Sequence, residues 1–240
     1  MNVLRKRAGV WIVYSIVLCS MILLAHYSSI AITTISEQRP LENRNCIVID
    51  AGHGGIDGGA VSCSGVYESH INLQIALRLD DLLHLLGMQT KMIRTEDISI
   101  YTSGNTIAAK KASDLKERVK IANETENGIL LSIHQNYYTD GRYSGAQMFY
   151  ASSSKSSLLA EMLQNAMKDA LDPANNRQIK RASGIYLMEH VKIPAVLVEC
   201  GFLSNAEEEA RLTDASYQKK LCCVIAAVCS RYLSSNPSLA

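Results

Sequence analysis

Four residues carry side chains that together could perform metal-assisted hydrolysis. Two are imidazoles, His53 and His134, and two are carboxylates, Glu68 and Glu199. Two histidines and one carboxylate form a common ligand set for catalytic zinc and leave a coordination position for water. Zinc lowers the pKa of that water to about 7, and a further carboxylate can then take its proton and pass it to a leaving amine. The residue types therefore predict His53, Glu68 and His134 as ligands of Zn²⁺, and Glu199 as the catalytic acid and base.

The order of these residues along the chain places them next to predicted strands. Three apolar runs of the kind typical of buried strands lead to His53, His134 and Glu199. These runs are residues 46–50, 129–133 and 194–198. Glu68 begins a helical segment that follows a glycine-rich loop. In open α/β sheets, sites form outside the carboxyl ends of strands, so we expect the four side chains near one sheet edge. The spacing alone does not prove that they converge.

Each of the four residues also has a purely structural interpretation. A histidine at a strand end, such as His134, is usually a loop or core residue, and Glu68 could be a first-turn glutamate favoured by the helix dipole. The glycine-rich loop around His53 could form a phosphate-binding turn, although it lacks the lysine of a P-loop. Glu199 is harder to explain in this way, because a carboxylate between apolar residues is costly to bury unless it is paired or functional.

Strand-like and helix-like segments alternate from Cys46 onward. This alternation predicts a single α/β domain with a mostly parallel or mixed central sheet flanked by helices. Apolar residues at helical spacing predict helices within 68–87, 156–171 and 216–233. Ser113 and Asp114 are predicted to cap a helix over 115–124. The run "GIYLM" (184–188) is predicted as a strand, and the polar segment 97–113 as an irregular lid on the substrate side.

The N-terminus combines a basic cluster with a long apolar stretch. Residues 5–7 are all basic, and no Asp, Glu, Lys or Arg occurs from 8 to 36. That stretch exceeds the roughly 20 residues that cross a bilayer as a helix, and the basic cluster favours export of the rest of the chain. A retained anchor is favoured over a cleaved signal peptide. The predicted organisation is a membrane anchor or signal segment (1–32), a linker (33–44), a catalytic domain (45–233) and a tail (234–240).

Charge and cysteine content exclude other classes of protein. The formal net charge is +1, so no basic excess indicates a nucleic-acid partner. The seven cysteines are odd in number and contain no CxxC spacing, which argues against a disulfide framework and against a cysteine zinc site. Most of these cysteines are therefore expected to be small buried hydrophobic residues.

The motifs, taken together, resemble those of the zinc-dependent N-acetylmuramoyl-L-alanine amidases of the amidase_3 family. The similar stretches are "VIDAGHGGIDGGA" (48–60), Glu68, "SIHQN" (132–136) and "VLVECGFLSN" (196–205). This resemblance implies His53, Glu68 and His134 as zinc ligands and Glu199 as the catalytic glutamate. It also implies hydrolysis of the amide between the lactyl group of N-acetylmuramic acid and L-alanine in peptidoglycan.

Within this family the chain is most similar to the germination-specific amidases of spore-forming Firmicutes. That resemblance implies spore-cortex peptidoglycan as the substrate, as a step toward muramic-δ-lactam and germination. It also implies an exported protein on the extracytoplasmic face of the membrane, in the forespore intermembrane space or cortex, either anchored or secreted. Whether an activating protein partner is required stays open.

Two alternatives to the amidase remain from the sequence. One is a non-catalytic peptidoglycan-binding module, and the other is a zinc peptidase or deacetylase that acts on the cell wall. Tyr137 and Tyr138 depart from the family pattern, in which small residues follow the asparagine. These aromatic side chains could narrow the cleft, stack on sugar or serve only in packing.

Overall fold

The computed structural model describes residues 17–23 and 45–236. Residues 17–23 form a short helix with exposed side chains. The predicted membrane anchor and linker otherwise lie outside the described residues. Among the residues that are described, none of the helices combines the length and the hydropathy that a membrane span requires.

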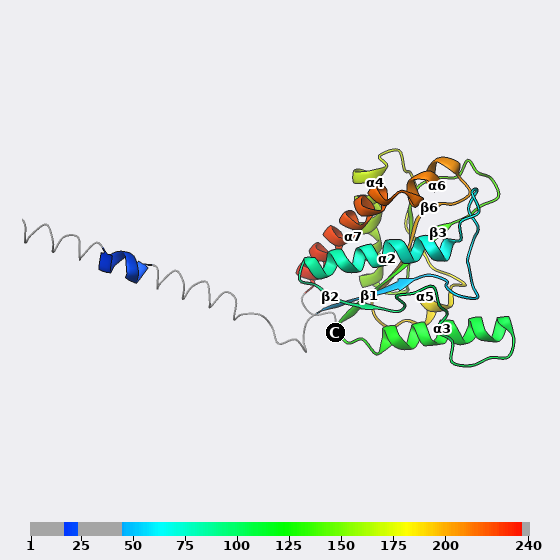
Figure 1. Cartoon of the computed structure of the whole chain (residues 1–240), viewed down its shortest axis with the longest axis horizontal. Coiled ribbons are helices and arrows are strands. Elements are labelled where there is room, and N and C mark those ends of the chain that lie inside the picture. Colours follow the sequence, from blue (N-terminus) through cyan, green and yellow to red (C-terminus); the bar gives the residue numbers. More distant parts are fainter. Residues whose placement is uncertain (1–16, 24–44, 237–240) are drawn as a thin grey trace, which may run out of the picture. The chain divides into compact units, whose positions relative to one another are not determined.

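A six-stranded mixed sheet forms the centre of the unit that begins at Asn45 (Figure 1). Its strand order is β2-β1-β3-β6-β4-β5. The strands are β1 (Cys46–Ala51), β2 (Gln89–Met92), β3 (Gly128–Asn136), β4 (Gln147–Tyr150), β5 (Lys180–Arg181) and β6 (Ala195–Phe202). The first four in spatial order are parallel, whereas β4 runs antiparallel to β6 and parallel to β5. The prediction of an α/β domain with a mixed central sheet is therefore confirmed.

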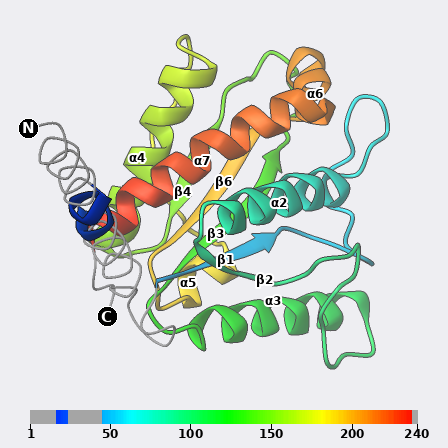
Figure 2. The same ribbon diagram turned by 60° about the vertical axis from the view of Figure 1, so that its left-hand side comes forward.

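Helices cover both faces of the sheet. Figures 1 and 2 show α3 and α5 on the opposite side from α2, α4 and α7. The helices are α2 (Glu68–Leu85), α3 (Ile107–Asn123), α4 (Ser154–Leu171), α5 (Tyr186–His190), α6 (Ala206–Thr213) and α7 (Ala215–Ser235). Successive residues of β1 point to opposite faces, so Ile47 and Ile49 pack in the core under α2 and α7, and Val48 packs in the core under α3 and α5. Burial on both faces explains why the central strands are continuous apolar runs.

The predicted start of α3 was wrong. The helix begins at Ile107 and is capped by Thr106, whose side chain accepts a hydrogen bond from the Ala109 amide. Ser113 and Asp114 lie inside the helix, where their side chains accept hydrogen bonds from backbone amides of the preceding loop, including those of Thr102 and Ile100. Their hydrogen-bonding capacity therefore stabilises the loop rather than the helix terminus. Part of the segment predicted as an irregular lid is consequently helical.

The predicted strand at 184–188 was also wrong. This run contributes to the short helix α5, with Leu187 and Met188 buried against the sheet. A short apolar run does not distinguish a strand from a buried helix by periodicity, and tertiary packing decides between them.

Candidate active site

The structure brings His53, Glu68 and His134 together at the carboxyl edge of the sheet. One ligand atom from each of them lies within 4.8 Å of the others. His53 Nε2 is 3.2 Å from Glu68 Oε2, and His134 Nδ1 is 3.0 Å from Glu68 Oε1. The carboxylate thus lies between two imidazoles that come from different strand ends.

Glycines permit the close approach of these three side chains. A Cβ atom on Gly52 would lie 2.1 Å from His134 Nε2, and one on Gly59 would lie 2.6 Å from Glu68 Oε2. His53 itself has a positive φ of 61°, which is uncommon for a residue with a side chain. The loop between β1 and α2 is therefore glycine-rich because its backbone lies directly against the cluster.

Glu68 is held in place by several hydrogen-bond donors. The backbone N–H of Gln135 and the side-chain Nδ2 of Asn72 both donate to Oε1, and the backbone N–H of Ala60 donates to Oε2. Burial raises the pKa of Glu68, but hydrogen bonds and charge from His134 and His53 outweigh it and hold the pKa well below its usual range. The carboxyl group is therefore an ionised carboxylate with a fixed orientation. Sequence reasoning missed Asn72, although its position four residues after Glu68 places it on the same helix face.

His53 is oriented by Asp57, which in turn contacts Lys111. His53 Nδ1 lies 3.0 Å from Asp57 Oδ2, and Lys111 Nζ lies 2.8 Å from Asp57 Oδ1. Burial lowers the pKa of His53, but the hydrogen bonds to Asp57 and Glu68 outweigh it and raise the pKa to about 9. Because Nδ1 is engaged by Asp57, Nε2 faces Glu68. A carboxylate behind an imidazole is the arrangement that orients metal-binding histidines.

Two buried arginines hold the backbone of the same loop. Arg94 donates from Nε to the Ala51 carbonyl at 2.8 Å and from Nη2 to the Gly52 carbonyl at 3.0 Å. Arg118 donates to the His53 carbonyl at 2.7 Å and pairs with the buried Asp50. These contacts fix the loop in the conformation that carries His53.

Glu199 lies beside His134 in the paired strands β3 and β6. Its Oε2 atom is buried and has no hydrogen-bond partner among the described residues. Burial raises the pKa of Glu199 to about 7, although the charge of His134 opposes this rise. A buried carboxylate oxygen without a partner is costly, and a pKa near neutrality suits a group that accepts and releases protons.

A cavity of about 210 Å³ adjoins the cluster between the sheet and the α3–α5 layer. Its apolar walls include Leu115, Leu187 and Leu197, and Lys110 and Lys111 also line it. The cavity reaches His53 and His134, so a bound molecule there would lie next to the three-residue cluster.

The donor atoms of the cluster fit a metal ion. Two imidazole nitrogens and an ionised carboxylate converge within 4.8 Å. His53 is supported by a hydrogen bond with Asp57, and Glu68 by one from Asn72. Such fixed ligands would hold a cation without large rearrangement. His53, Glu68 and His134 could therefore hold a metal ion.

The sequence of this α/β domain matches a known enzyme family. Residues 47–229 match the model of the Amidase_3 family, described as N-acetylmuramoyl-L-alanine amidase. The chain belongs to this family of peptidoglycan amidases.

Individual relatives agree with this assignment. The chain is 36% identical over 190 residues to the germination-specific N-acetylmuramoyl-L-alanine amidase of Bacillus subtilis (strain 168), covering 78% of this chain and 79% of the relative. Its fold is similar to that of the CwlD amidase from Clostridioides difficile, solved in complex with the GerS lipoprotein, with a TM-score of 0.76 and 39% identity over 79% of this chain and 98% of that chain. An N-acetylmuramoyl-L-alanine amidase from Clostridium difficile 630 gives a TM-score of 0.69 at 30% identity, over 80% of this chain and 98% of that chain. The resemblance to germination-specific amidases is thus confirmed.

Proposed function

We propose that this protein is a zinc-dependent N-acetylmuramoyl-L-alanine amidase of spore-cortex peptidoglycan. It would hydrolyse the amide between the lactyl group of N-acetylmuramic acid and L-alanine, as a step toward muramic-δ-lactam. The observation that carries this proposal is a buried oxygen of Glu199 that has no partner within residues 17–23 and 45–236 and lies beside the cluster of His53, Glu68 and His134. The similarity to a germination-specific amidase supports the spore-cortex substrate.

His53, Glu68 and His134 would hold the zinc ion, since two imidazoles and a carboxylate are a common catalytic zinc set. When bound there, the ion supplies a Lewis acid and lowers the pKa of a water molecule at its open position. Asp57 and Lys111 keep the His53 ring in the orientation that presents Nε2.

Glu199 is the proposed acid and base of the reaction. Its carboxylate accepts the proton of the attacking water and then donates that proton to the nitrogen of the leaving L-alanine. The pKa of about 7 that burial produces is matched to both transfers at neutral pH. The unpartnered Oε2 atom is available for this role because no other side chain among the described residues engages it.

The cavity beside the cluster is the proposed binding site of the stem peptide. Its leucine-rich wall fits small apolar side chains such as that of L-alanine, and Lys110 can bind a carboxylate of an acidic peptide. Both features lie on the side of the cluster formed by α3 and α5.

We place the protein on the extracytoplasmic face of the membrane. The basic cluster and apolar stretch of residues 1–32 support export with an N-terminal anchor or signal segment. A similar amidase was solved in complex with a lipoprotein, which supports a protein partner for this chain as well.

Product analysis by mass spectrometry tests this proposal. The full-length protein is incubated with zinc and purified cortex peptidoglycan, beside a Glu199→Gln variant that keeps the side-chain shape. We expect the wild type to release stem peptides with free L-alanine N-termini, and the variant to do so at least about 100-fold more slowly with unchanged zinc content.

Other products would contradict the proposal in distinct ways. Peptides cut within the stem would indicate a peptidase, and released acetate would indicate a deacetylase. Zinc-loaded protein that binds peptidoglycan without releasing any product would indicate a binding module.

A further inference from the structure

Beyond the catalytic cluster, β3 and β6 continue side by side into an exposed group of aromatic residues. His134 pairs with Glu199, and two residues further along β3 Asn136 pairs with Phe202. The Leu203 amide then donates to the Asn136 carbonyl, and the Tyr138 amide donates to Ser204 Oγ. The segments that follow His134 in β3 and Glu199 in β6 therefore lie side by side and form one continuous surface.

Tyr138, Tyr143 and Phe202 form this surface, which we call the aromatic shelf. The rings of Tyr138 and Tyr143 meet edge to face with centroids 4.8 Å apart, and Tyr143 stacks on Phe202 at 6.3 Å. Phe202 is buried, whereas Tyr138 is 52% exposed and Tyr143 is 46% exposed. The shelf therefore has a buried base and two exposed rings.

Arg177 packs against two of the three rings of the shelf. Its guanidinium lies 4.3 Å from the Phe202 ring centroid and 5.9 Å from that of Tyr143. The same side chain donates to the Ser144 carbonyl and to Gln147 Oε1, so its position is fixed. Exposed aromatic rings that are already ordered lose little conformational entropy when they bind a ligand.

A polar hollow adjoins the shelf on the side of Arg177. Its polar lining includes the neutral side chains of Ser144, Asn175, Asn176 and Asn205 and the charged side chains of Asp172, Glu207 and Arg211. Apolar rings next to polar and charged hydrogen-bonding side chains match the surface of a sugar, whose ring faces are apolar and whose edges carry hydroxyl and acetamido groups.

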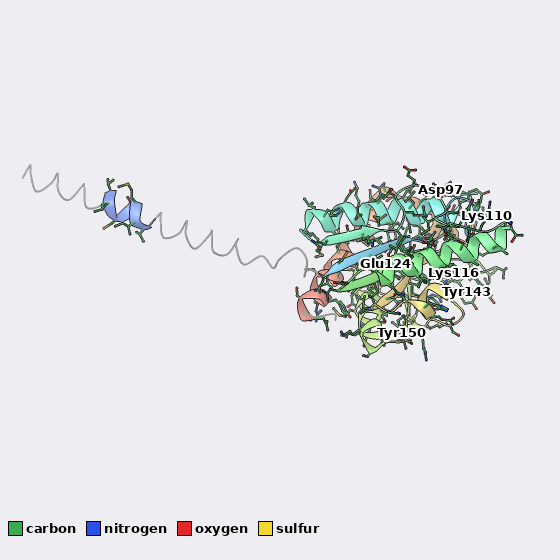
Figure 3. The ribbon with its side chains drawn as sticks, turned by 90° about the horizontal axis from the view of Figure 1, so that it is seen from below. Asp97, Lys110, Lys116, Glu124, Tyr143 and Tyr150 are labelled. Atoms are coloured by element: carbon green, nitrogen blue, oxygen red, sulfur yellow. The ribbon has the colours of Figure 1, made fainter. Side chains whose placement is uncertain are left out.

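The shelf lies at the catalytic end of the molecule but beyond the reacting groups. Figure 3 labels Tyr143 at the same end of the folded unit as Lys110, away from Glu124 at the other end of α3. A strand rise of about 3.3 Å per residue places Phe202 roughly 10 Å from Glu199. A sugar ring bound at the shelf would therefore belong to a unit of the polymer next to the one whose amide bond is cut.

We propose that the aromatic shelf and the adjoining hollow bind the N-acetylated glycan strand next to the muramoyl unit that is cut. This inference rests on the proposed function, because it takes peptidoglycan as the substrate. It assigns the shelf to the sugar chain and leaves the lysine-lined cavity on the α3 side to the peptide.

The test compares a polymeric with a monomeric substrate. Full-length wild type, a Tyr138→Ala/Tyr143→Ala variant and a Tyr138→Phe/Tyr143→Phe variant are assayed on cortex glycan strands that carry stems and on a single N-acetylmuramoyl-peptide. We expect the alanine variant to raise KM for the polymer about tenfold, with kcat unchanged and with unchanged kinetics on the monomer. The phenylalanine variant keeps the rings and should behave as the wild type does.

A second readout does not depend on catalysis. Co-sedimentation with glycan strands stripped of their stem peptides should detect the wild type and the phenylalanine variant, and about tenfold less of the alanine variant. Equal effects of the alanine variant on polymer and monomer, or undiminished co-sedimentation, would overturn the proposal. Failure of the proposed function would instead appear as wild-type protein that sediments with the strands but releases no peptide from either substrate.

Discussion

At the scale of single residues, the chemistry of each site group is set by its immediate neighbours. Glu68 and Glu199 are both buried glutamates, yet the pKa of Glu68 is lowered and that of Glu199 is raised to about 7. The difference arises because hydrogen bonds and charge from His134 and His53 outweigh the effect of burial at Glu68, whereas burial dominates at Glu199. Two identical side chains are thereby suited to the different roles proposed for them, metal ligand and proton carrier.

Replacing Asp57 should weaken metal binding through His53. We expect Asp57→Asn to lower zinc affinity by about 10- to 100-fold, because the carboxylate behind the imidazole no longer orients its ring. Competition with a chromophoric chelator measures the affinity. The matched control is Glu161→Gln on the exposed face of α4, which should leave zinc affinity unchanged. Equal affinities for wild type and Asp57→Asn would show that Asp57 does not act on the site.

At the scale of elements, the loop after β1 depends on space at its glycines. Gly52→Ala would place a methyl group against the His134 ring, so we expect kcat/KM to fall by at least about tenfold. Gly87→Ala is the control, because Gly87 has a positive φ of 74° but open space around it. That change should cost about 1 kcal/mol of stability and leave activity intact. Equal losses of kcat/KM in the Gly52→Ala and Gly87→Ala variants would exclude a specific effect of Gly52 on the site.

The buried ion pair that joins β1 to α3 makes the fold sensitive to acid. Burial raises the pKa of Asp50, but the Arg118 charge and the Ser132 hydroxyl outweigh it and lower the pKa below its ordinary value. Asp50 therefore stabilises the fold above the unfolded-state pKa of about 4, and this contribution is lost as pH falls through the lower folded-state pKa.

Urea denaturation across acidic pH checks this contribution. Asp50→Asn should lower the free energy of unfolding at pH 7 by about 3 kcal/mol, because Arg118 loses a buried partner. The variant should also lose less stability than the wild type between pH 7 and pH 3. Parallel pH profiles for the two proteins would contradict the assignment.

At the scale of the whole molecule, stability comes from the two hydrophobic cores rather than from disulfides. All seven cysteines are free, and Cys200, Cys222 and Cys229 are buried. Burial raises the pKa of Cys222 and Cys229 to about 12, so their thiols are poor nucleophiles at neutral pH.

Reductant should therefore leave the melting temperature of the protein unchanged. In thiol titration of the native protein, the exposed Cys63 and Cys223 should react before the buried thiols, and seven thiols should react after unfolding. A fall in Tm with reductant, or fewer than seven reactive thiols in the unfolded chain, would reveal a disulfide.

Local sequence patterns were sufficient to predict most of the framework. The strand over 128–136 follows from a long apolar run, and the helices α2, α4 and α7 follow from apolar residues at helical spacing. Long segments with such patterns are compatible with few other secondary structures. The start of α3 and the nature of α5 did not follow, because loop contacts of Ser113 and Asp114 and burial of Leu187 decided them.

The candidate site was likewise only partly predictable from the sequence. The sequence by itself determined which side chains could do chemistry, because imidazoles and carboxylates at strand ends are visible in the order of residues. Only the tertiary structure decided that they meet, since residues 66 positions apart, Glu68 and His134, come together through the pairing of β1 with β3. It also decided which carboxyl group has a lowered pKa and which has a pKa near neutrality, because burial and hydrogen-bond donors are properties of the packed chain.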